Sequence, residues 1–233
     1  MLKVEGLHSY YGRAHILADV AFQVDQGEVV VLLGRNGAGK STTLKSIMGL
    51  VPPARGRILF RNVDIAGREP FEIARLGLGY VPEDRRIFAE LTVEENLEVG
   101  RREPNVGRSM WTPERLFALF PNLAELRGRS AGQISGGEQR MLAIARTLMG
   151  NPSFLLLDEP SEGLAPLIVE QMARTILDLK REGLTVLLSE QNLHFARAVA
   201  DRALIIEEGR IRFAGAMAEL MADEAVQAQY LSL

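Results

Sequence analysis

Residue types suited to phosphate chemistry gather in the stretch GRNGAGKST, residues 34–42. It fits the pattern G-x-x-x-x-G-K-[ST], in which backbone N–H groups, a lysine and a hydroxyl converge on phosphate oxygens. We expect the amides of Gly37, Gly39 and Lys40 to cradle a β-phosphate, with the Lys40 ammonium reaching the β and γ oxygens. Ser41 would be a ligand of Mg²⁺. The whole predicted nucleotide-binding loop comprises Gly34, Arg35, Asn36, Gly37, Ala38, Gly39, Lys40, Ser41 and Thr42.

Two adjacent carboxylates, Asp158 and Glu159, follow an apolar run in FLLLDEP. At the carboxyl end of a strand, Asp158 can hold the water shell of Mg²⁺, and Glu159 can polarise the water that attacks a γ-phosphate. Each stretch has a simpler alternative, namely a glycine-rich turn with an exposed lysine and a strand that ends in a solvated acidic loop. Their combination favours a site that binds a nucleotide and hydrolyses its γ-phosphate.

A third stretch, ISGGEQR at residues 134–140, leads into apolar residues at helical spacing. Ser135 and Glu138 have the spacing of a capping box, in which each side chain satisfies a free amide at the start of a helix. That cap does not require Gly136 and Gly137, since each glycine costs roughly 1 kcal/mol against alanine in a helix interior. Bare glycines would let a phosphate approach the helix amides. A locally capped helix with permissive glycines is the alternative.

The elements that would position these residues follow from hydrophobic patterning. Short β-branched and apolar runs predict strands, and an amphipathic pattern over Leu167 to Lys180 predicts a helix. The order of strands and helix indicates a parallel sheet with helices packed across it. The predicted strands are Glu28 to Leu33, Leu78 to Val81, Phe154 to Leu157 and Thr185 to Leu188.

The middle and the end of the chain have distinct patterns. Near Thr112, a cap residue followed by proline and apolar periodicity predicts a helix, and the segment from about Arg85 to Met149 looks mainly helical. The tail ALIIEEGRIRFA from Ala203 predicts two strands around a turn, followed by a helix from Met217. We therefore predict a single domain with two parts, an ATP-binding core of residues 1–84 and 150–233 and a helical subdomain of residues 85–149.

The composition excludes several classes of protein. The chain has 233 residues, of which 47% are hydrophobic and 24% charged, as in ordinary globular proteins. A net charge of −3 argues against a general binder of nucleic acid or of anionic membranes. The absence of cysteine excludes a disulfide framework. No apolar run is long enough to span a membrane, and the N-terminal residues lack the apolar core of a signal peptide, so we expect a cytoplasmic protein.

Together, GRNGAGKST, FLLLDEP and ISGGEQR resemble the nucleotide-binding subunits of ATP-binding cassette (ABC) transporters, over essentially the whole chain. The resemblance implies an α/β P-loop NTPase fold of the RecA-like type, with a mostly parallel sheet, N-terminal antiparallel strands and an inserted helical subdomain. It implies ATP and Mg²⁺ as cofactors. It also implies two subunits packed head to tail, in which the signature residues of one touch the ATP held by the other. These residues would be Ser135, Gly136, Gly137 and Glu138.

Further positions match this family less evenly. Tyr11 stands where the family places an aromatic side chain that stacks on adenine, with Tyr10 as the weaker candidate and a partly buried strand tyrosine as the alternative. Glu83 stands where the family usually carries a glutamine that senses the γ-phosphate and contacts the membrane subunits. The resemblance thus makes Ser41, Asp158 and Glu83 the expected metal ligands.

The family's switch histidine is replaced by Gln191, while His194, one helical turn further on, has the character of a surface or packing residue. In SEGLAP, Ala165 replaces the aspartate usual in the dimer-contact loop. Glutamine can donate a hydrogen bond to the γ-phosphate but cannot carry a positive charge. We therefore hypothesise that hydrolysis with Gln191, Lys40 and Glu159 as catalytic residues is slower, or less sensitive to pH, than with a histidine.

Three stretches that differ from the usual pattern of the family, VPE, SEGLAP and SEQN, together resemble the LivF-type ATPases of branched-chain amino acid importers. This resemblance implies a second, unlike ATPase as heterodimer partner, with a homodimer of this chain in isolation as the alternative. It also implies two membrane permeases and, indirectly, a periplasmic or extracellular solute-binding protein, with this chain peripheral on the inner face of the cell membrane. An ATPase of a urea or short-chain amide importer is the first alternative. A soluble ABC ATPase of a non-transport process and a regulatory module that barely hydrolyses ATP are others.

Overall fold

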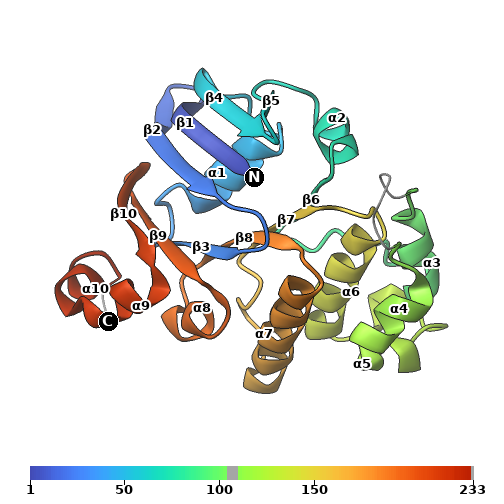
Figure 1. Ribbon diagram of the computed structural model, residues 1–233. Helices are drawn as coiled ribbons and strands as arrows, with labels where there is room; N and C mark the ends of the chain where they lie inside the picture. Colours follow the sequence, from blue (N-terminus) through green and yellow to red (C-terminus); the bar gives the residue numbers. More distant parts are fainter. Residues whose placement is uncertain (104–109, 232–233) are drawn as a thin grey trace.

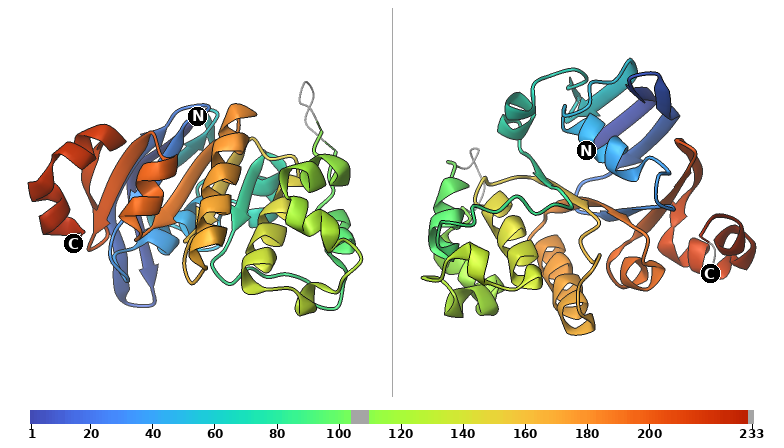
Figure 2. Two further views of the ribbon diagram at one scale, coloured as in Figure 1. Left: turned by 90° about the horizontal axis from the view of Figure 1, so that it is seen from below. Right: turned by 180° about the vertical axis from the view of Figure 1, so that it is seen from behind.

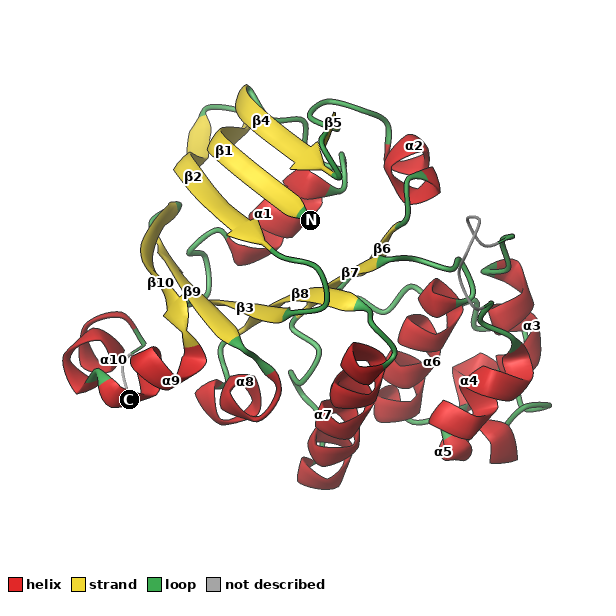
Figure 3. Ribbon diagram, viewed as in Figure 1, coloured by secondary structure: helices red, strands yellow, loops and turns green. Residues whose placement is uncertain are grey.

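The computed structural model describes residues 1–103 and 110–231, which form two sheets and a set of surrounding helices (Figures 1 and 3). The strands are β1 (Leu2–Tyr11), β2 (Ala14–Val24), β3 (Val29–Leu33), β4 (Arg55–Phe60), β5 (Val63–Asp64), β6 (Leu78–Val81), β7 (Phe154–Asp158), β8 (Thr185–Glu190), β9 (Arg202–Glu207) and β10 (Arg210–Ala216). The helices are α1 (Lys40–Ile47), α2 (Pro70–Arg75), α3 (Val93–Val99), α4 (Pro113–Leu119), α5 (Pro121–Glu125), the 3-10 turn η1 (Ala131–Gln133), α6 (Gly136–Leu148), α7 (Pro166–Arg181), α8 (Leu193–Val199), α9 (Met217–Ala222) and α10 (Glu224–Tyr230).

The larger sheet has the order β10-β9-β3-β8-β7-β6, and its strands are parallel except for the β9–β10 hairpin. The predicted parallel sheet is confirmed. Because the strands are in register, the carboxyl ends of β3, β7 and β8 lie along one edge, with Leu33 opposite Glu190 and Asp158 opposite Ser189. This edge is where ligands bind in open parallel sheets.

Strand β3 lies between two hydrophobic cores, which explains its run of consecutive apolar residues. Side chains alternate across a sheet, so Val29, Val31 and Leu33 join the core formed with α6, α7 and α8. Val30 and Leu32 join the second core, which α1 and the smaller sheet complete. Figure 2 (left) shows α7 and α8 in front of the larger sheet, and α1 lies on its other face.

The smaller sheet has the order β2-β1-β4-β5 and is antiparallel throughout, which confirms the predicted N-terminal antiparallel strands. Helix α1 lies between the two sheets (Figure 1). The end of β1, which carries Tyr11, is thereby brought close to the loop that precedes α1.

Helices α3 to α6 gather beside β6 at one end of the larger sheet (Figure 1). The predicted helix after Thr112 is confirmed as α4, with the Thr112 hydroxyl accepting from the amide of Arg115. The segment that follows β6 is not helical until Val93, because Arg85 and Arg86 have positive φ angles of 61° and 48°. Residues 104–109 of the predicted helical subdomain lie outside the described residues. The boundaries of that subdomain stay a prediction.

Helix α7, the β9–β10 pair and α9 also match their sequence patterns. In α7 the buried side chains Met172, Thr175, Ile176 and Leu179 form one helical face. Strands β9 and β10 flank a tight turn, and α9 starts at Met217 as predicted. Within the part of the chain that the structure describes, no helix has the length and apolar character that crossing a membrane requires.

Candidate ATP site

A cavity of about 240 Å³ opens at the carboxyl edge of the larger sheet, beside the loop between β3 and α1. It brings together side chains from four separate segments of the chain. Its lining residues are Tyr11, Ile16, Asn36, Gly37, Gly39, Lys40, Ser41, Thr42, Glu83 and Glu159. The structure therefore collects in one place most of the nucleotide-binding residues that the sequence suggests.

The glycines of this loop are needed for different structural reasons. Gly37 and Gly39 adopt φ angles of 80° and 112°, which L side chains rarely adopt, and a Cβ at Gly37 would point into open space. The loop can thus present its amides to a ligand at close range. A Cβ at Gly34 would lie 2.4 Å from the Ile206 carbonyl oxygen, so this glycine allows the loop to pack on β9. Gly34, Arg35 and Ala38 belong to the predicted loop but do not line the cavity.

Lys40 is held at the floor of the site. Its Nζ atom lies 3.0 Å from Glu159 Oε1 and donates to the carbonyl oxygens of Gly34 at 2.9 Å and of Arg35 at 3.2 Å. The side chains of Lys40 and Glu159 are only 3% and 6% exposed, so neither charge could be buried without the other. The ammonium is therefore held beside Glu159 in the wall of the cavity.

Asp158 accepts hydrogen bonds from three hydroxyl groups. Oδ1 accepts from Ser41 Oγ at 2.9 Å and from Ser189 Oγ at 2.7 Å, and Oδ2 accepts from the Tyr80 hydroxyl at 3.1 Å. Burial, together with the charge and hydrogen bond of Asp158, raises the pKa of Tyr80, so its hydroxyl stays a donor. The Ser41 hydroxyl and the Asp158 carboxylate offer the oxygen ligands that Mg²⁺ prefers, so the donor set fits this ion. Glu83, the third expected ligand, lines the same cavity.

Glu159 has a constrained backbone and several partners. Its φ angle is 46°, and its amide donates to Ser189 Oγ at 3.0 Å. Gln191 Nε2 donates to Glu159 Oε2 at 3.0 Å, which brings the predicted switch residue to the predicted base. Burial of the Glu159 carboxyl opposes ionisation, but hydrogen bonds from Glu162, Lys40 and Gln191 outweigh it and lower the Glu159 pKa. The carboxylate is ionised and aimed at the cavity.

Glu162, in the loop after β7, is a further acid that sequence reasoning did not assign. Its hydrogen bond to Glu159, with desolvation and the Glu159 charge, raises the pKa of Glu162 to about 7. The neighbouring Glu190 is buried, and it accepts hydrogen bonds from the amides of Ser161 at 2.9 Å and Gln191 at 3.1 Å. Glu190 thereby fixes the SEGLAP loop against the segment that carries Gln191.

The signature stretch stands apart from this cavity. The predicted capping box is present, with the Glu138 amide donating to Ser135 Oγ at 3.3 Å and the Ser135 amide donating to Glu138 Oε2 at 2.7 Å. None of Ser135, Gly136, Gly137 and Glu138 lines the cavity. A Cβ at Gly137 would lie 2.9 Å from Ile168 Cγ2 of α7, so close helix packing is one reason for this glycine.

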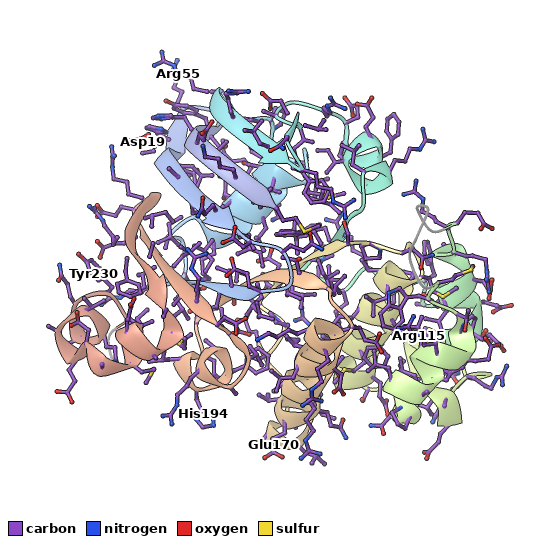
Figure 4. All side chains as sticks on the ribbon, in the orientation of Figure 1. Asp19, Arg55, Arg115, Glu170, His194 and Tyr230 are labelled. Atoms are coloured by element: carbon purple, nitrogen blue, oxygen red, sulfur yellow. The ribbon has the colours of Figure 1, made fainter. Side chains whose placement is uncertain are left out.

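The structure also places His194 and the two candidate tyrosines, Tyr10 and Tyr11. His194 is exposed on α8 with its side chain pointing away from the molecule, as its interpretation as a surface residue requires (Figure 4). Tyr10 stacks on His15 with ring centroids 4.3 Å apart, whereas Tyr11 lines the cavity. The structure thus favours Tyr11 over Tyr10 as the aromatic side chain near a bound base.

Three residues that hold Asp158 were not among the predicted site residues, namely Tyr80, Ser189 and Arg140. Arg140 Nη1 donates to the Asp158 carbonyl oxygen at 3.3 Å, and burial lowers the pKa of Arg140. A signal existed for Ser189, because it stands at the carboxyl end of a predicted strand that neighbours the FLLLDEP strand. Tyr80 and Arg140 are identifiable only once the strands and α6 are packed together.

Comparison with known proteins gives consistent matches. A family described as "ABC transporter" matches residues 17–162. The chain is 44% identical to the high-affinity branched-chain amino acid transport ATP-binding protein BraG of Pseudomonas aeruginosa, over 99% of both chains. It is 38% identical to the lipopolysaccharide export system ATP-binding protein LptB of Acidithiobacillus ferridurans, over 99% of this chain and 96% of that protein.

Two solved structures are also similar. The ADP conformation of MJ1267, an ATP-binding cassette of an ABC transporter, has a TM-score of 0.82 and 30% identity over 97% of this chain and 96% of that one. The dimeric structure of MJ0796, a bacterial ABC transporter cassette, has a TM-score of 0.78 and 25% identity over 93% of this chain and 99% of that one.

Proposed function

Since this chain belongs to the ABC transporter family and is an ATPase coupled to transport, we propose that it is the ATP-hydrolysing subunit of an importer for branched-chain or related hydrophobic amino acids. The observation that carries the substrate class is the 44% identity to BraG over 99% of both chains. The stretches VPE, SEGLAP and SEQN support the same assignment.

The proposed hydrolysis assigns one task to each residue of the site. Lys40 neutralises the β and γ oxygens, while the amides of Gly37 and Gly39 hold the β-phosphate. Glu159 polarises the attacking water, and Gln191 orients the Glu159 carboxylate through their 3.0 Å hydrogen bond. Ser41 and Asp158, with Glu83 close by, would hold Mg²⁺, which supplies further charge neutralisation on the phosphates.

The proposed working unit is a pair of cassettes that ATP joins head to tail. Support comes from the position of Ser135 and Gly136, which lie outside the chain's own cavity, and from the dimeric cassette with 25% identity. The γ-phosphate would make charge-assisted hydrogen bonds with both subunits, and hydrolysis would break them. We propose a second, unlike ATPase as the natural partner, in keeping with the LivF-type resemblance.

The proposed permease contact lies in a groove of about 490 Å³ between the core and the helices α3 and α6. Leu50, Phe88 and Val99 are exposed along this groove, and such apolar exposure is typical of protein interfaces. The groove begins at Pro82, next to Glu83 of the ATP site, so movement there would reach the permeases. This contact would hold the chain on the inner face of the membrane.

Lipopolysaccharide export is the second candidate, because LptB is 38% identical over nearly the same length. A urea or short-chain amide importer is the third, from the sequence resemblance. The test of these three candidate functions is to delete the gene and to measure the uptake of radiolabelled leucine, isoleucine and valine. We expect uptake to fall and to be restored by the natural chain but not by Glu159→Gln. Normal uptake together with defective lipopolysaccharide export, or with loss of urea uptake, would replace the amino acid assignment.

Light scattering of the Glu159→Gln variant tests the proposed assembly, alone and with the co-expressed second ATPase, with MgATP, with MgADP and without nucleotide. We expect a dimer with MgATP only, and we expect Ser135→Arg to abolish it, since a bulky side chain there blocks approach to the helix start. The matched control is Arg127→Ala, which removes an exposed guanidinium that pairs with Glu94. Monomers in every mixture would refute the ATP-joined pair.

A further inference from the structure

A second cavity, of about 290 Å³, lies between α5, α6 and α7, three helices that neighbour one another in Figure 1, and it shares no lining residue with the ATP cavity. Its volume is close to the lower limit of small-molecule sites, which is about 300 Å³. All three helices contribute apolar side chains to its wall, namely Leu123 of α5, Met141 of α6 and Ile168 of α7. The cavity therefore has room for a small molecule with an apolar end.

The hydroxyl of Thr175 on α7 faces this cavity without a hydrogen-bond partner. A threonine in a helix can donate to the carbonyl oxygen four residues earlier, and Thr43 of α1 and Thr147 of α6 both do so at 2.9 Å. Thr175 is only 6% exposed, and among the residues that the structure describes no group pairs with its hydroxyl. A buried hydroxyl without a partner costs free energy. A ligand with a polar group at this position would remove that cost.

Two opposite charges accompany Thr175 on the same face of α7. Arg174 and Asp178 also line the cavity, and they stand one helical turn apart. Arg174 lies 3.6 Å from Glu170, an exposed ion pair that competes weakly with a ligand. Asp178 Oδ1 accepts from Arg181 Nη1 at 2.5 Å. Within the described part of the chain, Asp178 Oδ2 accepts no hydrogen bond, so this oxygen is available to a ligand.

The other polar side chains that bear on the choice of ligand already have partners. Asn122 Nδ2 donates to Gln171 Oε1 at 3.3 Å, which joins α5 to α7 beside the cavity. Glu138 Oε2 accepts from the Ser135 amide at 2.7 Å. The groups free to bind a ligand are therefore those of Arg174, Thr175 and Asp178.

The charges of this wall select the chemical class of the ligand. A simple anion would meet the Asp178 carboxylate, and a simple cation would meet the Arg174 guanidinium. A zwitterion satisfies both, with its carboxylate on Arg174 and the Thr175 hydroxyl and its ammonium on Asp178. Because the rest of the available wall is apolar, the remainder of the zwitterion should be apolar as well.

We propose that this cavity binds a free α-amino acid with an apolar side chain, such as leucine. Arg174, Thr175 and Asp178 hold its carboxylate and ammonium, and its side chain packs against Leu123 and Met141. The choice of leucine rests on the proposed function, since the chain would then bind, on the inner face of the membrane, the kind of molecule that its transporter imports. The cavity and its charges do not depend on that function.

Isothermal titration calorimetry of the purified full chain with leucine tests binding, and two analogues test the charges. Isocaproate lacks the ammonium of leucine, and isoamylamine lacks its carboxylate. We expect leucine to bind and each analogue to bind more weakly by about tenfold or more, which is the effect of losing one hydrogen bond to a charged group. Equal affinity for all three compounds would overturn the proposed recognition of a zwitterion.

Substitutions on α7 locate the binding site. Arg174→Ala and Thr175→Val should each weaken leucine binding about tenfold or more. Without leucine, Thr175→Val should keep or raise the thermal unfolding temperature, because it removes an unpaired buried hydroxyl. Arg174 is exposed, so its replacement leaves the fold intact. The matched control is Arg127→Ala, which also removes an exposed guanidinium but does not line the cavity, and it should bind leucine like the natural chain.

Two further results would overturn the site. In one, the natural chain gives no heat of binding at millimolar leucine. In the other, Arg174→Ala and Thr175→Val bind leucine as tightly as the natural chain. Failure of the proposed function gives a different result, since amino acid uptake would then not depend on the gene, whether or not the purified chain binds leucine.

Discussion

The edge of the larger sheet and the start of α6 are the two places where we predict phosphate contacts, and their side chains are organised differently. At the sheet edge, Lys40, Asp158 and Glu159 are buried and each is bonded to several neighbours. At the start of α6, Ser135 is exposed, and its hydroxyl accepts a hydrogen bond from the Glu138 amide of its own capping box. The first region is already organised for chemistry, whereas the second offers a surface.

Because of this difference, substitutions in the two regions should have different effects. Groups at the sheet edge are preorganised, so little reorganisation is needed when charge develops in a transition state. The start of α6 is only partly buried, and its capping box satisfies the amides of Ser135 and Glu138. We therefore expect substitutions at the sheet edge to change chemistry or stability, and substitutions at the start of α6 to change association.

The largest expected effect is on turnover. Glu159→Gln should lower ATP hydrolysis by the assembled complex about 10²- to 10⁴-fold, because the general base is lost. ATP affinity should not weaken, since a neutral amide no longer pairs with Lys40. Turnover and nucleotide binding are measured in parallel. The control is Glu170→Gln, which alters an exposed acid on α7 that points away from the sheet edge (Figure 4). Equal losses in both variants would contradict the assignment.

The same glycine-to-alanine change should act differently in the two regions. Gly39→Ala should cost about 3 kcal/mol of unfolding free energy, from a strained positive φ and a Cβ 2.8 Å from Leu17 Cδ2. Gly136→Ala should be neutral or stabilising by up to about 1 kcal/mol, because alanine favours helix and only the end of the Arg85 side chain must shift. Urea unfolding measures the free energy of unfolding of both variants. Similar losses in the two variants would contradict the predicted difference between the regions.

The raised pKa of Glu162 predicts that the free energy of unfolding depends on pH through a group at the sheet edge. Its pKa is raised from 4.5 to about 7, so between these values the folded chain holds a proton that the unfolded chain has lost. This contribution to stability is therefore full below pH 4.5 and is lost as the pH rises through about 7. Glu162→Gln should flatten that slope, whereas Glu170→Gln should not. Urea unfolding between pH 5 and 8 checks this, and parallel curves for the natural chain and Glu162→Gln would contradict it.

The smallest expected effect concerns Gln191. Gln191→His places an ionisable group beside Glu159, so turnover should rise a few-fold and depend on pH near the histidine pKa of about 6.5. The assembled complex is assayed from pH 6 to 8, with His194→Gln as the control on the exposed face of α8. An unchanged rate and pH profile would show that the neutral amide serves as well as a histidine.

Features with local causes could be predicted from the sequence. The β-branched run of β3, the phosphate loop after it and the capping box at Ser135 each depend on residues close together in the chain, and all three are present in the structure. The parallel sheet followed from the order of strands and helices. The roles assigned to individual site residues stay predictions, although the cavity brings many of them together.

Features with distant causes could not be predicted. Gly137 packs against Ile168 of α7, and Gly136 packs against Arg85. Close packing is therefore a second explanation for two glycines at the start of α6, beside the phosphate hypothesis. The pairing of Lys40 with Glu159 and the hydrogen bond from Tyr80 to Asp158 arise only when β6, β7 and α1 meet. The positive φ angles of Arg85 and Arg86 also have no signal in the sequence, because neither residue is a glycine or an asparagine.

The backbone of Glu159 has a consequence for protein engineering. A glutamate at a φ angle of 46° is less favourable than glycine or asparagine would be. A redesign that optimises folding alone would replace Glu159 and its buried partner Lys40 with residues that need no compensation. Such a protein would gain heat resistance and lose the reaction, so thermostable versions of this chain are best sought by substitution on the outer faces of α7 and α8, with the sheet edge left as it is.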